Sequence, residues 1–173
     1  MSKTVPSTND PKQSRGLLFG LLGISFIILI LGGLLTSLGI GPWYQELSFP
    51  PFQPPAWVFT PAWVLILTLL AMGTWKLILQ GPEQSMALTG IALILYGCQI
   101  VLNAGWSLLF FSVARPDFAL GTIIVLDIVL AAMVVTYFRV SKFAGICLIP
   151  YLAWLLFATA INCWIVFKNP SFG

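Results

Sequence analysis

Five long stretches without charge, broken only once by an aspartate, constrain this chain more than any other feature. They run over Gly16–Ile40, Ala56–Trp75, Ser85–Ser112, Phe118–Phe138 (interrupted by Asp127) and Phe143–Phe167. Each reaches the roughly 20 residues that a helix needs to cross about 30 Å of hydrocarbon. With 59% hydrophobic and only 8% charged residues, the chain is not an ordinary soluble domain. The sequence predicts an all-α membrane protein, a bundle of five transmembrane helices.

The N-terminal end predicts a polar tail followed by one membrane domain. Residues 1–15 are polar and contain Pro6 and Pro11, so we expect a disordered tail there and the five-helix domain over residues 16–173. The first apolar stretch is longer than the apolar region of a signal peptide, and no clear cleavage site follows it. We therefore expect it to be retained as a helix.

Several classes of site are not expected from the residue types. Cys98, Cys147 and Cys163 all fall inside predicted helices, where cysteine usually acts as a small buried hydrophobe. The chain has no histidine, no paired-cysteine motif and no acidic cluster, so we expect no metal site and no obligatory cofactor. Its net charge of +3 is spread along the sequence, which argues against nucleic acid as a partner.

The distribution of lysine and arginine predicts an orientation in the membrane. Cytoplasmic loops of membrane proteins carry an excess of these residues. A cytoplasmic N-terminus places six basic residues inside (Lys3, Lys12, Arg15, Lys76, Arg139 and Lys142) and two outside (Arg115 and Lys168). The first loop is then external. The absence of a recognisable presequence favours a bacterial cell membrane.

The first loop, Gly41–Pro55, differs from the short connections elsewhere. Its five prolines fix backbone angles and remove donors, so we expect a stiff segment without regular structure. Three aromatic residues, Trp43, Tyr44 and Phe52, can pack it onto the helices. The pattern is compatible with a lid over a cavity, and also with a plain connector that has aromatic anchors at the membrane interface.

One helix carries a polar stripe that cannot face lipid without cost. Gln99, Asn103 and Trp106 stand at i, i+4 and i+7 and share one face of the third predicted helix. Amide side chains in hydrocarbon need hydrogen-bond partners, so this face points toward protein or toward a ligand cavity.

One face of the fifth predicted helix indicates space for a flat ligand. In the fifth predicted helix, Trp154 and Ala158 share a face, and Pro150 is expected to kink the helix. Small residues also let transmembrane helices approach each other closely, so a helix–helix contact is the alternative. On the predicted orientation, six residues fall in the outer half of the membrane, on the side of the first loop: Trp63, Asn103, Trp106, Phe118, Trp154 and Ala158. This convergence predicts an aromatic pocket there.

These segments together resemble the translocator-protein family of tryptophan-rich sensory proteins (TspO/MBR). The matching residues are Trp43-Tyr44, Leu47, Pro50, Pro54-Pro55, Trp57-Val58-Phe59 and Pro61-Ala62-Trp63; then Gln99, Leu102-Asn103, Trp106-Ser107 and Phe110-Phe111; and finally Pro150 to Trp154, Phe157-Ala158-Thr159 and Asn162. The match covers essentially everything after the N-terminal tail. The resemblance implies a five-helix bundle, commonly a homodimer, with one ligand cavity beneath the first loop. It implies binding of porphyrins, including haem; animal members also bind cholesterol and synthetic ligands.

The resemblance also implies which residues form the site. Nine residues would line or support the cavity: Trp57, Trp63, Gln99, Asn103, Trp106, Phe118, Trp154, Ala158 and Ile161. In bacterial relatives, the tryptophans that match Trp63 and Trp154 are linked to light-dependent breakdown of porphyrin, which makes these two the candidate photochemical residues. An indole can stack on a macrocycle and can donate an electron to its excited state.

Two departures from the family pattern bear on function. Animal relatives have a carboxylate where this chain has Thr122, and Asp127 lies about 140° further around the helix, roughly opposite the expected cavity face. A functional role and a hydrogen-bonded packing role are both open for Asp127. The family's sterol motif needs a central tyrosine, but this chain has Cys163 there. The formal match Val135–Arg139 elsewhere is a weak pattern, so we do not expect physiological sterol transport.

The sequence leaves three functions open. We expect a membrane protein that binds tetrapyrrole and acts in tetrapyrrole homeostasis or stress signalling. The alternatives are a transporter of porphyrins or other hydrophobic ligands, and a protein that degrades porphyrin in light. No internal repeat or pair of broken helices supports transport, and no nucleophile–base pair supports a conventional enzyme. A homodimer is expected mainly from the resemblance, with Gly16 and Gly20 as a small-residue pair.

Overall fold

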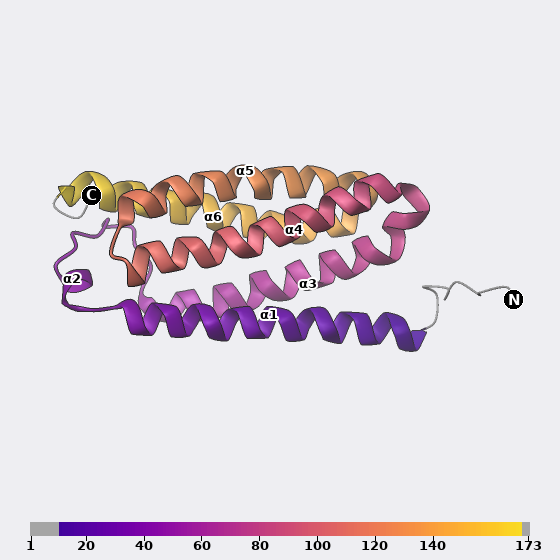
Figure 1. The fold of residues 1–173 in the computed structure, drawn as a ribbon, viewed down its shortest axis with the longest axis horizontal. Coiled ribbons are helices and arrows are strands. Elements are labelled where there is room, and N and C mark those ends of the chain that lie inside the picture. Colours follow the sequence, from indigo (N-terminus) through magenta and orange to yellow (C-terminus); the bar gives the residue numbers. More distant parts are fainter. Residues whose placement is uncertain (1–10, 171–173) are drawn as a thin grey trace, which may run out of the picture.

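The computed structural model describes residues 11–170, and five of its helices are long and apolar enough to cross a membrane. In Figure 1 they run along the long axis of the molecule: α1 (Pro11–Gly39), α3 (Phe59–Gln84), α4 (Met86–Ser107), α5 (Pro116–Val140) and α6 (Lys142–Lys168). Three short turns complete the described part: α2 (Pro42–Gln45), the 3₁₀ turn η1 (Ala56–Val58) and the π-helical turn η2 (Leu108–Ser112). The predicted five-helix bundle is confirmed.

Helix α1 begins earlier than the sequence suggested. It starts at Pro11, so the boundary predicted after residue 15 is wrong for Pro11–Arg15, and residues 1–10 lie outside the described part of the chain. Proline is tolerated in the first turn of a helix, because the N–H that it lacks has no partner there. The indole Nε1 of Trp75 donates to the backbone oxygen of Ser14 at 2.8 Å, which joins this turn to α3.

Helix α3 also runs further than predicted. It continues past Trp75, where the second apolar stretch ends, and through Pro82 to Gln84. A proline so close to the end removes only one backbone hydrogen bond from the last turns. Ser85 alone separates α3 from α4, and its side-chain oxygen accepts from the backbone N–H of Leu88 at 3.2 Å. Connections this short make consecutive helices antiparallel.

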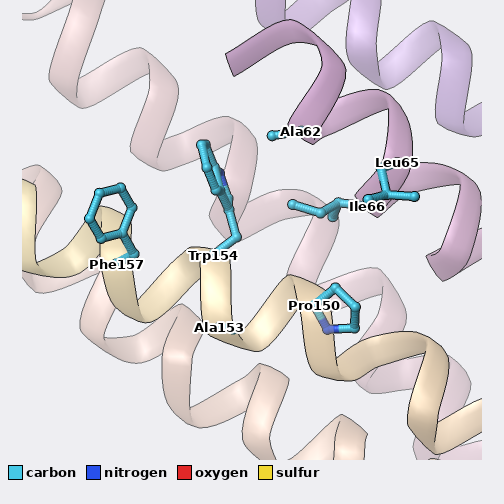
Figure 2. Close-up of a pocket in the computed structure, with 7 residues that line it drawn as sticks. All are labelled: Ala62, Leu65, Ile66, Pro150, Ala153, Trp154 and Phe157. Carbon is cyan, nitrogen blue, oxygen red and sulfur yellow. The ribbon is translucent and has the colours of Figure 1, made fainter. Parts of the chain in front are cut away.

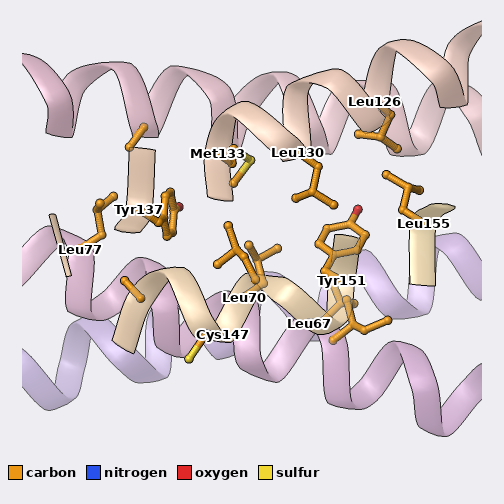
Figure 3. Close-up of a cluster of buried hydrophobic side chains, with 14 of the residues drawn as sticks. Leu67, Leu70, Leu77, Leu126, Leu130, Met133, Tyr137, Cys147, Tyr151 and Leu155 are labelled. Carbon is orange, nitrogen blue, oxygen red and sulfur yellow. The ribbon is translucent and has the colours of Figure 1, made fainter. Parts of the chain in front are cut away.

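The core is formed mainly by α3, α5 and α6. Figure 3 shows Leu70 of α3, Leu130 of α5 and Tyr151 of α6 packed together, and all three are buried. The hydroxyl groups of Thr74 and Tyr137 lie 3.0 Å apart and share a hydrogen bond within this core. Between transmembrane helices, close packing and such hydrogen bonds replace the hydrophobic effect as the source of stability.

A glycine brings α3 and α6 together at one level. A Cβ atom placed on Gly73 would lie 3.0 Å from the backbone oxygen of Ala144 and from Cδ1 of Leu148. The two helices therefore leave no room between them near Gly73. Helix α1, by contrast, packs mainly against α3 and buries only Leu21 and Ser25 along its length.

The first loop contains regular structure that the sequence did not predict. Its short helix α2 begins at Pro42, whose ring sets the backbone angle that a first helical residue needs. A single 3₁₀ turn, η1, then leads into α3. In Figure 1 this loop lies at the same end of the bundle as the C-terminus, opposite the N-terminal end of α1.

Candidate ligand-binding cavity

A cavity of about 510 Å³ lies within the end of the bundle that the first loop covers. All five long helices contribute to its walls, and residues of the loop close its end. None of the described residues that line it carries a formal charge. A volume of this size is typical of sites for small organic molecules.

Three tryptophans dominate the walls. Trp63 comes from α3, Trp106 from α4 and Trp154 from α6, and Phe59 and Phe111 add further aromatic surface. The polar groups are few and neutral, with Asn103 and Ser107 among them. An uncharged cavity with aromatic walls suits a large flat apolar ligand, because ring faces stack and bury much area.

The polar stripe of α4 is fixed by hydrogen bonds to α6. The Gln99 Nε2 and Asn103 Nδ2 atoms both donate to the Tyr151 hydroxyl, at 2.8 and 2.9 Å. Gln99 is only 1% exposed, so its amide serves this contact, whereas Asn103 also lines the cavity. The ring of Tyr151 contacts that of Trp63 edge-on, with centroids 5.9 Å apart. One hydroxyl thus links the polar stripe to a wall of the cavity.

The indole of Trp106 is held by a second polar link. Its Nε1 atom donates to Oδ1 of Asn162 at 3.0 Å, and Nδ2 of Asn162 donates to the backbone oxygen of Pro116 at the same distance. Asn162 is 1% exposed and therefore joins α4, α5 and α6 inside the protein. The face of Trp106 stacks on Phe110, with centroids 5.4 Å apart. Its orientation is thus fixed on two sides.

A π-helical turn places Phe110 and Phe111 at this end of α4. Turns of this kind are rare and often occur at functional sites. Phe111 lines the cavity, and its backbone lies close to Gly39. A Cβ atom on residue 39 would collide with the Phe111 backbone. Glycine at position 39 therefore allows α1 to close the cavity against the end of α4.

The first loop is fastened over the cavity. Asn169, just after α6, accepts from the Ser48 backbone N–H at 2.7 Å and donates from Nδ2 to the Ser48 backbone oxygen at 3.1 Å. Tyr44 and Gln53 line the cavity from the loop, and the ring of Tyr44 packs on Phe49, with centroids 5.0 Å apart. Burial raises the pKa of the Tyr44 phenol, so it stays neutral at physiological pH.

The comparisons with known proteins agree with this architecture. The model of the TspO/MBR family matches residues 21–167. This chain belongs to the TspO/MBR family. It is 30% identical to the tryptophan-rich protein TspO of Chlorobaculum tepidum, over 86% of this chain and 93% of that protein. It is 34% identical to the tryptophan-rich protein TspO of Archaeoglobus fulgidus, over 80% and 87% of the two chains. The translocator protein of Sus scrofa is 36% identical, over 76% and 80%.

Membership of the TspO/MBR family makes the chain a multi-pass membrane protein, in agreement with its five apolar helices. The side of the membrane on which the first loop lies stays a prediction from the basic residues, and the kind of membrane also stays a prediction.

The structure brings five of the nine residues implied by the family resemblance to one cavity. They are Trp63, Asn103, Trp106, Trp154 and Ala158. Gln99 lies behind the wall and supports Asn103 through Tyr151. Ile161 packs in a separate hydrophobic cluster with Leu47 and Phe110, so it supports the loop rather than the cavity wall.

The remaining two of the nine residues lie away from the cavity, on the exposed surface. Trp57, in the turn before α3, is 74% exposed on the outside of the bundle. Phe118 is 56% exposed at the start of α5, where the Arg115 guanidinium lies 4.2 Å from its ring centroid. Both residues stand in the first turn after a connection, where helical periodicity does not fix the direction of a side chain.

Sequence reasoning missed the contribution of α1. The cavity is lined by six residues of this helix and by the residue just beyond its C-terminus: Ile28, Leu29, Gly32, Gly33, Thr36 and Ser37, and then Ile40. The pair Gly32-Gly33 followed by Thr36-Ser37 is the one local signal, since small residues repeat there at helical spacing.

The Asp127 side chain of α5 makes a hydrogen bond to α6. Its Oδ2 atom accepts from the Thr159 hydroxyl of α6 at 2.8 Å, and Asp127 does not line the cavity. This geometry agrees with a hydrogen-bonded packing role. Within the described residues, no group of three or more histidine, cysteine or acidic side chains could hold a metal ion.

Proposed function

We propose that this chain binds a tetrapyrrole, such as protoporphyrin IX or haem, in the cavity beneath the first loop, and acts in tetrapyrrole homeostasis or stress signalling. The observation that carries this proposal is the set of three indoles, Trp63, Trp106 and Trp154, around one uncharged cavity. A porphyrin is flat, aromatic and largely apolar, so it complements walls of this kind. Membership of the TspO/MBR family supports the proposal, because the resemblance to this family implies binding of porphyrins.

A fluorescence titration tests this proposal. We expect protoporphyrin IX to quench the tryptophan emission of the purified protein and the quenching to saturate at one ligand per chain. The variant Trp57→Phe is the matched control, because Trp57 is exposed outside the cavity, and its affinity should equal that of the wild type. Quenching that never saturates, or that is equally strong after all three cavity tryptophans are replaced by phenylalanine, would contradict binding in the cavity.

Light-dependent breakdown of the bound porphyrin is a second candidate function. It is favoured by the position of Trp63 and Trp154, which line the same cavity from facing helices. Phenylalanine keeps a flat ring for stacking but is a far poorer electron donor than an indole.

Illumination of the complex separates the second candidate from simple binding. We expect the absorption spectrum of bound protoporphyrin IX to change more slowly in Trp63→Phe and Trp154→Phe than in the wild type. Trp57→Phe should react at the wild-type rate, and a sample kept in the dark should not change. If both cavity variants bind and react like the wild type, the indoles have no chemical role and only the binding function stands.

A further inference from the structure

A second hollow lies on the outside of the bundle, between α3 and α6 (Figure 2). Its volume is about 400 Å³, and its lining is apolar. Ala62 of α3 and Ala153 of α6 leave the space, since both side chains are single methyl groups. Leu65, also in its lining, is 56% exposed. In a membrane, this groove therefore opens toward lipid.

The groove and the cavity share Trp154. Its indole lines both spaces, and in Figure 2 it extends from α6 toward Ala62 of α3. Phe59 contacts the same indole edge-on, with centroids 5.6 Å apart, and Phe157 lies at 6.0 Å. Near Trp154, the groove and the cavity are therefore separated by side chains and not by backbone.

The loop side of the cavity is closed more firmly. Asn169 makes two hydrogen bonds with the backbone of Ser48, and Trp43 Nε1 donates to the backbone oxygen of Gly39 at 3.1 Å. Opening this end requires a whole segment of chain to move and these bonds to break. Rotation of a side chain is a smaller and faster change than displacement of a loop.

Between α3 and α6, close packing at one level leaves the groove as the place for an opening. Near Gly73 the two helices are in contact with no spare space, so they cannot separate there without losing core packing. At the level of Ala62 and Ala153 the space already exists, and the Trp154 ring borders it. A hydrophobic ligand also concentrates in the bilayer, because its apolar surface is excluded from water.

We propose that a flat hydrophobic ligand dissolved in the membrane enters the cavity through the groove between α3 and α6, and that the Trp154 side chain is the gate. This inference rests on the proposed function, because it takes the cavity as the destination of the ligand. It adds a path and a second, transient contact site for the same class of ligand.

Rates of binding test the entrance separately from the affinity. The variants Ala62→Phe and Ala153→Phe place a ring in the groove at positions that do not themselves line the cavity. With protein in lipid nanodiscs, association of protoporphyrin IX is followed by tryptophan quenching, and dissociation by transfer to excess empty vesicles. We expect both rate constants to fall by about tenfold or more while the Kd stays unchanged, because a blocked path slows entry and exit equally. Ala160→Phe, an exposed position on α6 outside both spaces, is the control and should behave like the wild type.

A cross-linked loop provides the opposite arm of the experiment. A disulfide between Ser48→Cys and Asn169→Cys, in a chain whose three native cysteines are replaced by alanine, locks the loop in place. We expect both rate constants to stay at the values of the reduced form.

A strong slowing by this disulfide, with no slowing by Ala62→Phe or Ala153→Phe, overturns the proposal and makes the loop the entrance. A groove variant that weakens the Kd at an unchanged association rate also overturns it, since the groove would then be part of the equilibrium site. If the wild type binds no protoporphyrin IX, the proposed function fails and this inference fails with it.

Discussion

Replacing Ala158 with phenylalanine is expected to abolish or strongly weaken porphyrin binding while the fold stays intact. Ala158 lines the cavity one turn beyond Trp154 on α6. The added ring would enter space that the ligand needs, and would stand beside the indoles that stack on it. We expect the Kd for protoporphyrin IX to rise by at least about tenfold, a loss of roughly 1.4 kcal/mol. Tryptophan quenching measures the affinity, and the melting temperature in detergent measures the stability.

Helix–helix packing at Ala158 predicts a different pair of results. If the methyl group fills a close contact, the larger ring overpacks it and lowers stability by about 1–3 kcal/mol. Ala160→Phe serves as the matched control, because it adds the same ring at an exposed position on the same helix. If the melting temperature falls for Ala158→Phe but not for Ala160→Phe, or if the affinity is unchanged, the Ala158 face of α6 is not part of the ligand site.

Removal of the Tyr151 hydroxyl is expected to have the largest effect on stability. Tyr151→Phe keeps the ring in the core but leaves the Gln99 and Asn103 amides without their common acceptor. An unpartnered buried donor costs about 1–3 kcal/mol, and Gln99 is almost fully buried. We therefore expect the free energy of unfolding, measured by denaturation in mixed micelles, to fall by about 1–3 kcal/mol.

A double variant separates the hydrogen bonds from the packing around Tyr151. Tyr151→Phe combined with Gln99→Leu replaces a donor and its acceptor by apolar groups, a change that is often nearly neutral. We expect the double variant to recover part of the stability lost by Tyr151→Phe alone. A stability of Tyr151→Phe within about 0.5 kcal/mol of the wild type would show that these bonds contribute little, as in many membrane helix pairs.

Much of the fold could be predicted from the sequence, because the thickness of the hydrocarbon sets the length of each apolar stretch. The ends of the helices could not, since charge marks where a stretch leaves the lipid and not where the helix stops. Helix α3 therefore continues through Lys76 to Gln84. The hydrogen bonds that hold the first loop to Asn169 could not be predicted either, because Ser48 and Asn169 lie 121 residues apart in the sequence.

The site was predictable where polarity and periodicity act together. Asn103 and Trp106 share a helical face with Gln99, and a polar face within an apolar helix must find protein or ligand. Helix α1 gives no comparable contrast, because it is apolar around most of its circumference, and so its place in the cavity wall was missed. Trp57 was expected in the lining from the family resemblance, and Phe118 from the resemblance and its predicted depth in the membrane, but each lies at the start of a helix and is exposed.

The most direct test of the central claim is an experimental structure of the protein with protoporphyrin IX in a lipid environment. The account predicts one macrocycle in the cavity, in contact with Trp63, Trp106 and Trp154 beneath the first loop. A macrocycle bound only on the outer surface of the bundle or in the groove between α3 and α6, with the cavity empty at saturating ligand, would contradict it.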